Sequence, residues 1–414
     1  MSLRKTTPIY IAVTLIIGLL AGFFIGQTAT SGAVVERTVT ELRAVTATLT
    51  ETRVAATTVV RTETATVTAV VEEPLVKYAK LFDLRRGEGY FLLRDGVNRT
   101  ILLVPKGMPV PNVKADVVVR TPVERAVLMS ATHVALVERL RELDPEIYSR
   151  VDAIMWGRSY EWHFPHVAKL LADGRVKDVG AAWAPDYEQL AAIRPDLVMI
   201  YTFPGDPLVS KLEELKLPYV VNNEYLETTL LGRFEYIKFV AVFFGLLDEA
   251  NKVFRYVESS VQLTSSTSKR LVEANVVKPP KVLWFSVFRG TVYVAGGESY
   301  VANALTDLAA QYLFRDIKAS GSRTVSVEEL VARAVDADII VISTDLITSA
   351  EDLLKEIPQL RESKAFQQSR IYRYNSNIFQ LGYYATEDWF RELASVLYPA
   401  YFHDSAYDFF VSLR

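Results

Sequence analysis

Two stretches of the chain share one pattern of polar and apolar positions. Residues 188–202 and residues 328–344 each open with a carboxylate ahead of a helix-period run, and each then enters an apolar run of strand length. The apolar runs lie within Asp196–Thr202 and Asp338–Thr344. A strand that is buried on both faces reads as such a continuous run of Val, Ile and Leu. The pattern therefore predicts two copies of a helix–strand unit.

A helical segment separates the two copies, over residues 228–272. Apolar residues recur there at i, i+3, i+4, i+7 and i+11, namely Ala250, Val253, Phe254, Val257 and Val261. This spacing places them on a single face of a helix. Strand, turn and helix signals alternate on both sides of the segment. The sequence predicts an α/β fold of two Rossmann-like lobes joined by one long helix.

The N-terminus indicates where the chain resides. Arg4 and Lys5 precede an apolar run over residues 9–26, and no further charge occurs before Glu36. Such a run spans a bilayer as a slightly short helix or serves as a signal peptide, and its positive charges stay inside. Small residues over 29–33 would permit cleavage, whereas no cysteine is available for lipid attachment. We expect an uncleaved anchor on the extracytoplasmic face of the membrane, with secretion after cleavage as the alternative.

Composition shifts divide the rest of the chain. The Thr- and Val-rich residues 27–72 predict a low-complexity stalk, and residues 73–120 predict an N-terminal β-embellishment around the Asp95–Gly96 turn signal. An oligomerising coiled coil is the alternative for the stalk, because apolar residues recur there every three or four positions, at Val35, Val39, Leu42, Val45 and Leu49. The predicted segments are 1–26 (anchor or signal), 27–72 (stalk), 73–120 (embellishment), 121–226 (first lobe), 227–277 (connecting helix) and 278–414 (second lobe).

Composition also narrows the function classes. The chain of 414 residues has no cysteine, which excludes disulfides, zinc–thiolate sites and cysteine nucleophiles. A formal net charge of −3 gives no reason to expect nucleic acid as a partner. No Gly-x-Ser-x-Gly, P-loop or dinucleotide fingerprint is present, so we do not expect an enzyme. The four histidines disfavour a bare zinc or manganese site, which would need about three or four ligands.

Several short motifs carry a family resemblance, and their order and spacing around the helical segment matter more than any one of them. They are Pro122–Val127, Val179–Gly180, Tyr187–Leu190, Arg194–Val198 and Val325–Leu330. Over about residues 120–400 the chain resembles the extracytoplasmic substrate-binding proteins of ABC importers for iron-siderophores, haem and cobalamin. The resemblance implies two lobes that hold a small-molecule metal chelate between them, a rigid helix that limits closure, and an ABC permease with its ATPase subunits as partners. It implies no resident cofactor, and a ferric siderophore is the first expectation for the ligand.

Loops at the carboxyl ends of the strands should face the cleft between two such lobes. Aromatic faces there would pack on a chelate, and arginines would pair with its anionic oxygens. The candidates from the first lobe are His133, Arg158, Tyr160, Trp162, His163, Trp183 and Tyr201. The candidates from the second lobe are Trp284, Arg289, Tyr300 and Asn377. Core burial is the alternative for Trp284, and a solvated or surface-paired role is the alternative for the two arginines.

Glu188 and Glu328 occupy matching positions of the repeat. The resemblance implies that an acidic residue on each lobe meets arginines of the permease, so these two glutamates are the docking candidates. The alternative is that each only favours the positive end of a helix. Two other function classes stay open, a structural or adhesive cell-surface protein and a membrane-anchored enzyme on the same scaffold.

Overall fold

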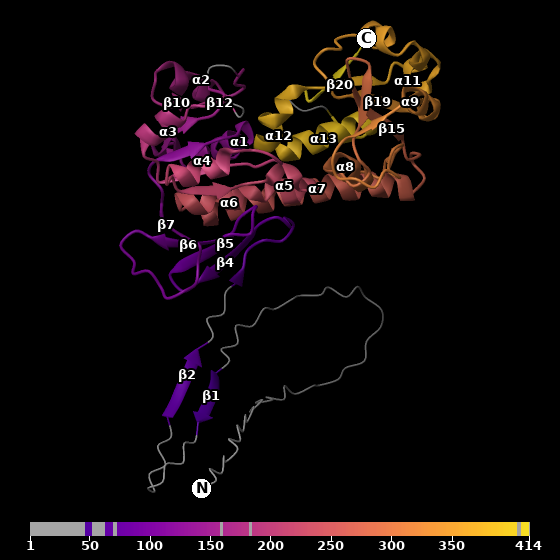
Figure 1. Cartoon of the computed structure of the whole chain (residues 1–414). Helices are drawn as coiled ribbons and strands as arrows, with labels where there is room; N and C mark the ends of the chain where they lie inside the picture. Colours follow the sequence, from indigo (N-terminus) through magenta and orange to yellow (C-terminus); the bar gives the residue numbers. More distant parts are fainter. Residues whose placement is uncertain are drawn as a thin grey trace, which may run out of the picture. The chain divides into compact units, whose positions relative to one another are not determined.

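The computed structural model describes residues 46–51, 63–68, 73–157, 160–181, 184–403 and 407–413 (Figure 1). The chain forms two compact units, Met1–Glu73 and Pro74–Arg414. In the first unit, β1 (Thr46–Glu51) and β2 (Glu63–Thr68) pair antiparallel. Leu49 of the predicted helical stripe therefore lies in a strand, as its β-branched neighbours favour, so residues 46–51 do not form the helix of the coiled-coil alternative. The other four residues of the stripe lie outside the described residues.

The predicted membrane segment, residues 9–26, lies outside the described residues, as does most of the predicted stalk. No helix in the described part of the chain is long and apolar enough to cross a bilayer.

A small β-domain opens the second unit. Its strands, in spatial order, are β3 (Glu73–Pro74, at the unit boundary), β4 (Asp83–Gly87), β5 (Tyr90–Arg94), β6 (Thr100–Pro105) and β7 (Val117–Thr121). The predicted strands of the embellishment correspond to β5 and β6. At the predicted turn between them, the buried Asp95 carboxylate binds the Arg99 guanidinium and accepts the backbone N–H of Val221 at 3.2 Å. Asp95 thereby ties the β-domain to the first lobe.

The first lobe is built on a parallel sheet of five strands, in the order β10-β9-β8-β13-β14. These strands are β8 (Ala126–Leu128), β9 (Val151–Ile154), β10 (Lys177–Asp178), β13 (Leu197–Ile200) and β14 (Tyr219–Val221). Its helices are α1 (Ala131–Arg141), α2 (Pro165–Ala172), α3 (Tyr187–Ile193) and α4 (Leu208–Glu214), with the 3-10 turns η1 (Ile147–Arg150) and η2 (Glu224–Leu226). The short strands β11 (Gly180–Ala181) and β12 (Ala184–Pro185) form a separate antiparallel sheet of two strands.

The connecting segment is three helices rather than one, α5 (Leu230–Phe234), α6 (Tyr236–Phe244) and α7 (Leu247–Glu273). Gly245 ends α6 in the left-handed conformation, at φ 73°, which glycine adopts without a Cβ clash. The predicted stripe is confirmed on α7, where Ala250, Phe254, Val257 and Val261 are buried. With 27 residues, α7 is about 40 Å long at about 1.5 Å per residue.

The second lobe has a mixed sheet in the order β18-β16-β15-β19-β20-β21, and β17 pairs with β15. Its strands are β15 (Lys281–Phe288), β16 (Thr291–Val294), β17 (Gln311–Tyr312), β18 (Arg323–Val325), β19 (Ile339–Ile342), β20 (Ile371–Tyr374) and β21 (Phe410–Ser412). Its helices are α8 (Tyr300–Asp307), α9 (Val327–Ala334), α10 (Ala350–Glu356), α11 (Lys364–Gln367), α12 (Leu381–Tyr384) and α13 (Thr386–Leu397), with η3 (Pro358–Glu362) and η4 (Ser376–Phe379). The strands β15, β19 and β20 run parallel.

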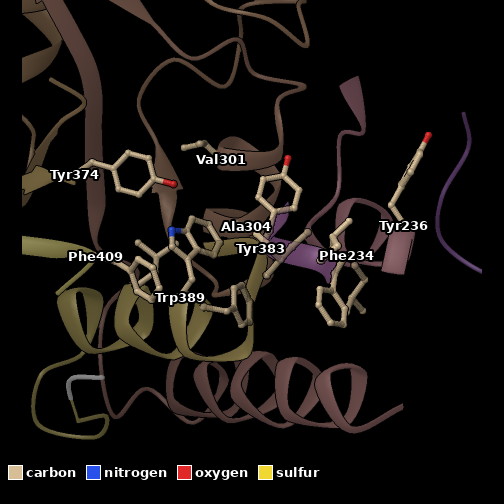
Figure 2. Close-up of a cluster of buried hydrophobic side chains, with 14 of the residues drawn as sticks. Phe234, Tyr236, Val301, Ala304, Tyr374, Tyr383, Trp389 and Phe409 are labelled. Carbon is tan, nitrogen blue, oxygen red and sulfur yellow. The ribbon is translucent and has the colours of Figure 1, made fainter. Parts of the chain in front are cut away.

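The predicted repeat is present in both lobes, as α3–β13 and α9–β19. Both strands are buried at every residue. The side chain of Asp186 caps α3 and that of Ser326 caps α9, and each accepts a backbone N–H in the first turn of its helix. The two lobes contact each other where α12 packs against α1. The connecting helix α7 packs against α6 and against α13 of the second lobe. An aromatic cluster around Trp389 fills the core of the second lobe (Figure 2).

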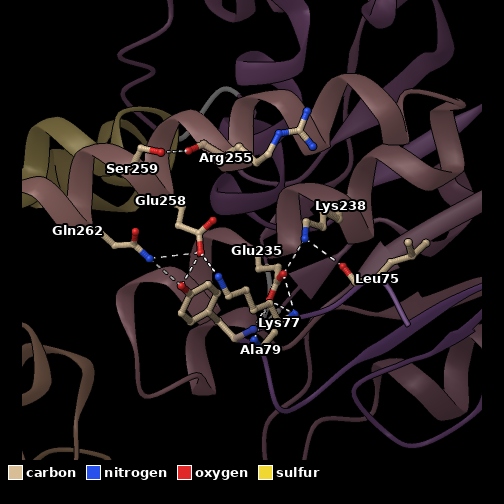
Figure 3. A network of polar contacts seen from close by, with 10 residues as sticks. Leu75, Lys77, Ala79, Glu235, Lys238, Arg255, Glu258, Ser259 and Gln262 are labelled. Atoms are coloured by element: carbon tan, nitrogen blue, oxygen red, sulfur yellow. Dashed lines mark hydrogen bonds and ion pairs between the residues drawn. The ribbon is translucent and has the colours of Figure 1, made fainter. Parts of the chain in front are cut away.

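The buried carboxylate of Glu235 fastens the β-domain to the connecting helices (Figure 3). The Glu235 carboxylate, which has no exposed surface, accepts the backbone N–H groups of Lys77, Tyr78 and Ala79 at distances of 2.6–3.0 Å. It also pairs at 2.7 Å with the ammonium of Lys238, which donates to the Leu75 carbonyl at 3.0 Å. Each charge is therefore compensated in the interior, where an unpaired one would be costly.

Candidate functional site

The segment after β9 carries three predicted ligand contacts. The Tyr160 and Trp162 rings meet edge to face at 5.4 Å, and the Trp162 indole donates to the Gly157 carbonyl at 2.8 Å. Gln380, which precedes α12 in the second lobe, accepts the His163 backbone N–H at 2.9 Å and donates to the Glu161 carbonyl at 2.7 Å. This buried amide joins the two lobes and fixes the segment. The His163 imidazole itself is exposed.

Aromatic side chains also gather where β13 and β14 end. The Tyr201 ring lies 6.2 Å from that of Phe203 and 5.9 Å from that of Tyr225. The Tyr225 hydroxyl donates to the Thr202 carbonyl at 2.6 Å, which connects the two loops. Phe203 is 43% exposed, Tyr225 is 37% exposed, and the neighbouring Leu226 is 48% exposed. The first lobe therefore presents an apolar surface at the carboxyl edge of its sheet.

The second lobe presents a comparable surface at the carboxyl ends of its parallel strands. Phe288 is the last residue of β15, Leu346 lies in the loop after β19, and Phe379 lies in η4 after β20. These side chains are 50%, 71% and 54% exposed, respectively. The guanidinium of the predicted contact Arg289 lies 5.1 Å from the Phe288 ring. Contiguous exposed apolar patches mark interaction sites on soluble proteins, and these side chains share the carboxyl edge of one sheet.

A small pocket, open to solvent at its mouth, lies between α5 and the helices of the second lobe. It is lined by Leu230, Arg233, Tyr300, Ile378, Phe379, Gly382, Tyr383, Thr386 and Trp389. The Arg233 Nε donates to the Tyr383 hydroxyl at 2.9 Å, and the guanidinium lies 3.9 Å from the centre of the Tyr300 ring. Burial raises the pKa of Tyr383 far above its usual range, so the hydroxyl stays neutral. Burial acts to lower the pKa of Arg233, but Tyr383, Tyr300 and Glu224 outweigh it and the guanidinium stays charged.

Three predicted contacts are buried, and their side chains offer no open surface to a ligand. His133 in α1 is fully buried, and its Nε2 lies 3.6 Å from the buried Glu224 carboxylate. Trp284 is 3% exposed and packs against Tyr374 and Phe410, so the core alternative holds for it. Asn377 is 5% exposed, and its amide donates to the Tyr407 carbonyl at 2.8 Å.

Two further predicted contacts, Arg158 and Trp183, lie outside the described residues. No group of three or more His, Cys, Asp and Glu side chains in the described part of the chain is arranged to hold a metal ion. His166, in the first turn of α2, instead packs edge-on against the Tyr148 ring at 5.2 Å.

Both docking candidates are exposed in the first turn of a helix. Glu188 lies in α3 and Glu328 lies in α9, each directly before the buried strand of its repeat unit. A hydrogen bond with its own backbone N–H, together with the Ser326 side chain, lowers the pKa of Glu328. The Glu328 contacts match the helix-end role, and both side chains are exposed to solvent at the surface of their lobes.

Sequence reasoning missed the residues that carry the pocket and most of the apolar surface. They are Arg233, Tyr383, Gln380, Phe203, Tyr225, Leu226, Phe288, Leu346 and Phe379. Extending the strand-end rule by a few residues would have included Phe203, Phe288 and Phe379. No sequence signal distinguishes Arg233, which lies in a segment read as a connecting helix.

Three comparisons with known proteins bear on this site. Residues 159–378 match a family described as periplasmic binding protein. An uncharacterised lipoprotein of Methanocaldococcus jannaschii is 30% identical over 333 residues, which cover 78% of this chain and 78% of the relative. A second uncharacterised lipoprotein of that organism is 27% identical over 306 residues, covering 72% of this chain and 76% of the relative.

The fold is similar to that of solved binding proteins. A periplasmic haem-binding protein from Pseudomonas aeruginosa superposes with a TM-score of 0.55 at 17% identity, covering 70% of this chain and 98% of that chain. A periplasmic haem-binding protein from Roseiflexus sp. RS-1, in its apo form, superposes with a TM-score of 0.51 at 18% identity, covering 67% and 98%. At such identities the likeness concerns the fold.

Proposed function

Because the chain belongs to the periplasmic binding protein family, we propose that it captures a metal chelate between its lobes and hands it to the permease of an ABC importer. The members of this family are extracytoplasmic transport proteins and not enzymes. They bind small-molecule substrates and work with an ABC permease and its ATPase. The proposal concerns which ligand this chain takes and which of its residues hold it.

The exposed apolar side chains at the strand ends of both lobes carry the proposal. Phe203, Tyr225 and Leu226 in one lobe and Phe288, Leu346 and Phe379 in the other are each more than a third exposed. Covering one such side chain with a ligand contributes roughly half of the ~1.5–3 kcal/mol of full burial, because about half of its surface is already covered, so a bulky and largely apolar ligand that covers several of them is favoured. Of the sequence-predicted contacts, Tyr160, Trp162, His163, Tyr201, Arg289 and Tyr300 stay in the proposed site.

The ligand class we propose is an iron-siderophore, haem or a cobalamin-type corrinoid. The haem-binding proteins of similar fold support this range, and so does the mixture of aromatic and arginine side chains at the site. No observation on the described residues favours the alternatives, a bare zinc or manganese binder and an adhesive surface protein.

Tryptophan fluorescence tests the proposal directly. The full chain is titrated with ferric siderophores, haemin and cobalamin at micromolar concentrations. We expect saturable quenching by one of these classes, because Trp156 and Trp162 lie next to Tyr160 in the proposed site. Absence of quenching by all three would remove the proposed ligand class.

Substitution of the exposed phenylalanines tests the apolar surface. We expect F203S and F379S each to weaken binding of the quenching ligand by roughly 3- to 10-fold, since each removes an apolar contact of a half-exposed ring, worth about 0.7–1.5 kcal/mol. The control is Y256S, because Tyr256 is 58% exposed on α7, away from the strand ends. Equal affinities for all three variants and the unchanged chain would show that the ligand binds elsewhere.

We propose that Glu188 and Glu328 dock the two lobes on the permease. Charge reversal in E188R and E328R should leave the dissociation constant for the ligand unchanged and should reduce uptake into vesicles that contain the permease. The two substitutions together should reduce uptake more than either alone, because the glutamates occupy matching positions of the two lobes. Reversal of the exposed Glu351 on α10 is the control. Unaltered uptake by the double variant would contradict the docking role.

We also propose that residues 9–26 anchor the chain in the membrane. The relatives from Methanocaldococcus jannaschii are named lipoproteins, whereas this chain has no cysteine that a lipid would modify. An apolar segment preceded by Arg4 and Lys5 supplies attachment by another route. Carbonate-resistant membrane association that is lost on removal of residues 1–26 is the expected result.

A further inference from the structure

Arg233 is placed at the pocket without a carboxylate partner. Three other half-buried arginines, Arg99, Arg139 and Arg150, each contact an acidic side chain. Within the residues that the structure describes, Arg233 contacts only the Tyr383 hydroxyl, through its Nε and Nη2, and the faces of Tyr300 and Tyr383. Its Nη1 has no hydrogen-bond acceptor in the same set of residues.

The acidic side chain that acts on Arg233 is Glu224, which contacts other groups and keeps one oxygen without a hydrogen bond among the described residues. Glu224 is 1% exposed, accepts the Thr132 hydroxyl at 2.5 Å and lies against His133. It acts on Arg233 through space and makes no ion pair with it. The positive charge at the pocket is therefore stabilised by aromatic faces, which contribute about 0.5–2 kcal/mol, and by Glu224 through space, without an ion pair.

The surroundings of the guanidinium define what the pocket accepts. Leu230, Ile378, Phe379 and Trp389 form apolar walls, and the mouth of the pocket lies beside the exposed Phe379 ring. A half-buried guanidinium with a free N–H in such walls favours a negatively charged oxygen attached to an apolar body. A neutral amide or a cation would leave the charge uncompensated.

We propose that Arg233, oriented by Tyr383 and Tyr300, binds an anionic oxygen group of the ligand in this pocket, so that the protein selects anionic metal chelates over neutral and cationic ones. This inference rests on the proposed function and specifies its substrate class. A carboxylate arm and a phenolate arm share the required chemistry, and separate probes distinguish them.

The test compares ligands that differ in charge. The carboxylate pair is haemin and haemin dimethyl ester, and the phenolate pair is a ferric tris-catecholate and a neutral ferric tris-hydroxamate. We expect the full chain to bind haemin or the tris-catecholate at least 10-fold more tightly than the ester and the tris-hydroxamate. R233Q should lose about 10- to 100-fold in affinity for the anionic probe and keep its affinity for the uncharged ones, so that the preference disappears.

The matched control is R255Q, which removes an exposed arginine on α7 and should change neither affinity. Circular dichroism shows whether R233Q folds, and if it does not, Y383F is the test variant. This substitution removes the hydroxyl that orients Arg233. It should therefore reduce the preference for anionic over uncharged probes about 3- to 10-fold. An unchanged preference in R233Q or in Y383F, or equal binding of charged and uncharged probes by the unchanged chain, overturns this inference alone. Failure of the unchanged chain to bind any probe overturns the proposed function, and the inference with it.

Discussion

Replacement of Glu235 by alanine should lower the free energy of unfolding by about 3–5 kcal/mol. The substitution removes the acceptor of three backbone N–H groups, those of Lys77, Tyr78 and Ala79. It also leaves the Lys238 ammonium in the interior with the Leu75 carbonyl and the face of the Phe254 ring as its remaining partners among the described residues. Buried donors without acceptors cost far more than the average hydrogen bond contributes. The midpoint of urea unfolding, at an unchanged slope, measures the loss.

The Asp248–Arg86 ion pair provides a matched control for this prediction. It also joins the β-domain to a connecting helix, but its side chains are 74% and 42% exposed, and the two atoms are 3.0 Å apart. Exposed pairs contribute about 0–1 kcal/mol, so D248A should be close to the unchanged chain. A loss in E235A no larger than that in D248A would mean that burial of the carboxylate does not fasten the β-domain.

Replacement of Trp389 by alanine should cost about 3–5 kcal/mol, through lost apolar burial and the cavity that remains. The indole has no exposed surface and lies among the rings of Tyr300, Tyr374, Phe390 and Phe410, at centroid distances of 6.0–6.5 Å. Figure 2 shows it beside Tyr374 and Phe409. Because Trp389 also lines the Arg233 pocket, the alanine variant should bind ligand more weakly as well. Thermal or urea unfolding measures the stability, and fluorescence of the remaining tryptophans measures binding.

The phenylalanine variant at the same position separates packing from a specific role of the indole. W389F keeps an aromatic ring in the cluster and leaves a smaller cavity, so its loss of stability should be clearly smaller than that of W389A. Equal losses in the two variants would contradict the cavity explanation.

Local periodicity explains which parts of the fold were predictable. The strands β13 and β19 are buried on both faces, and this burial required the apolar runs that the sequence shows. The stripe on α7 was readable because one helix face packs against the core along its length. Gly245 shows what an apolar pattern does not reveal. The apolar residues continue on both sides of it, yet its left-handed backbone ends α6 there.

Predicted contact residues of similar type differ in whether the structure buries them or leaves them at the pocket. Trp284 points into the core of the second lobe, and His133 is enclosed against Glu224, whereas Tyr300 lines the pocket. Which side of a strand or helix faces a neighbouring element depends on contacts between residues far apart in the sequence. The hydrogen bond between Gln380 and the backbone of His163 is such a contact, since 217 positions separate these two residues in the sequence.

The sequence by itself determined two helix–strand repeats, the connecting helical stripe and the aromatic content of the strand-end loops, because each depends on neighbours within a few turns of the chain. Only the tertiary structure decided that Arg233 lies at a pocket without a carboxylate partner, that Glu235 fastens the β-domain, and which predicted contacts are buried. Hydrogen bonds, ion pairs and burial depend on which distant segments pack together, and no local pattern encodes that choice.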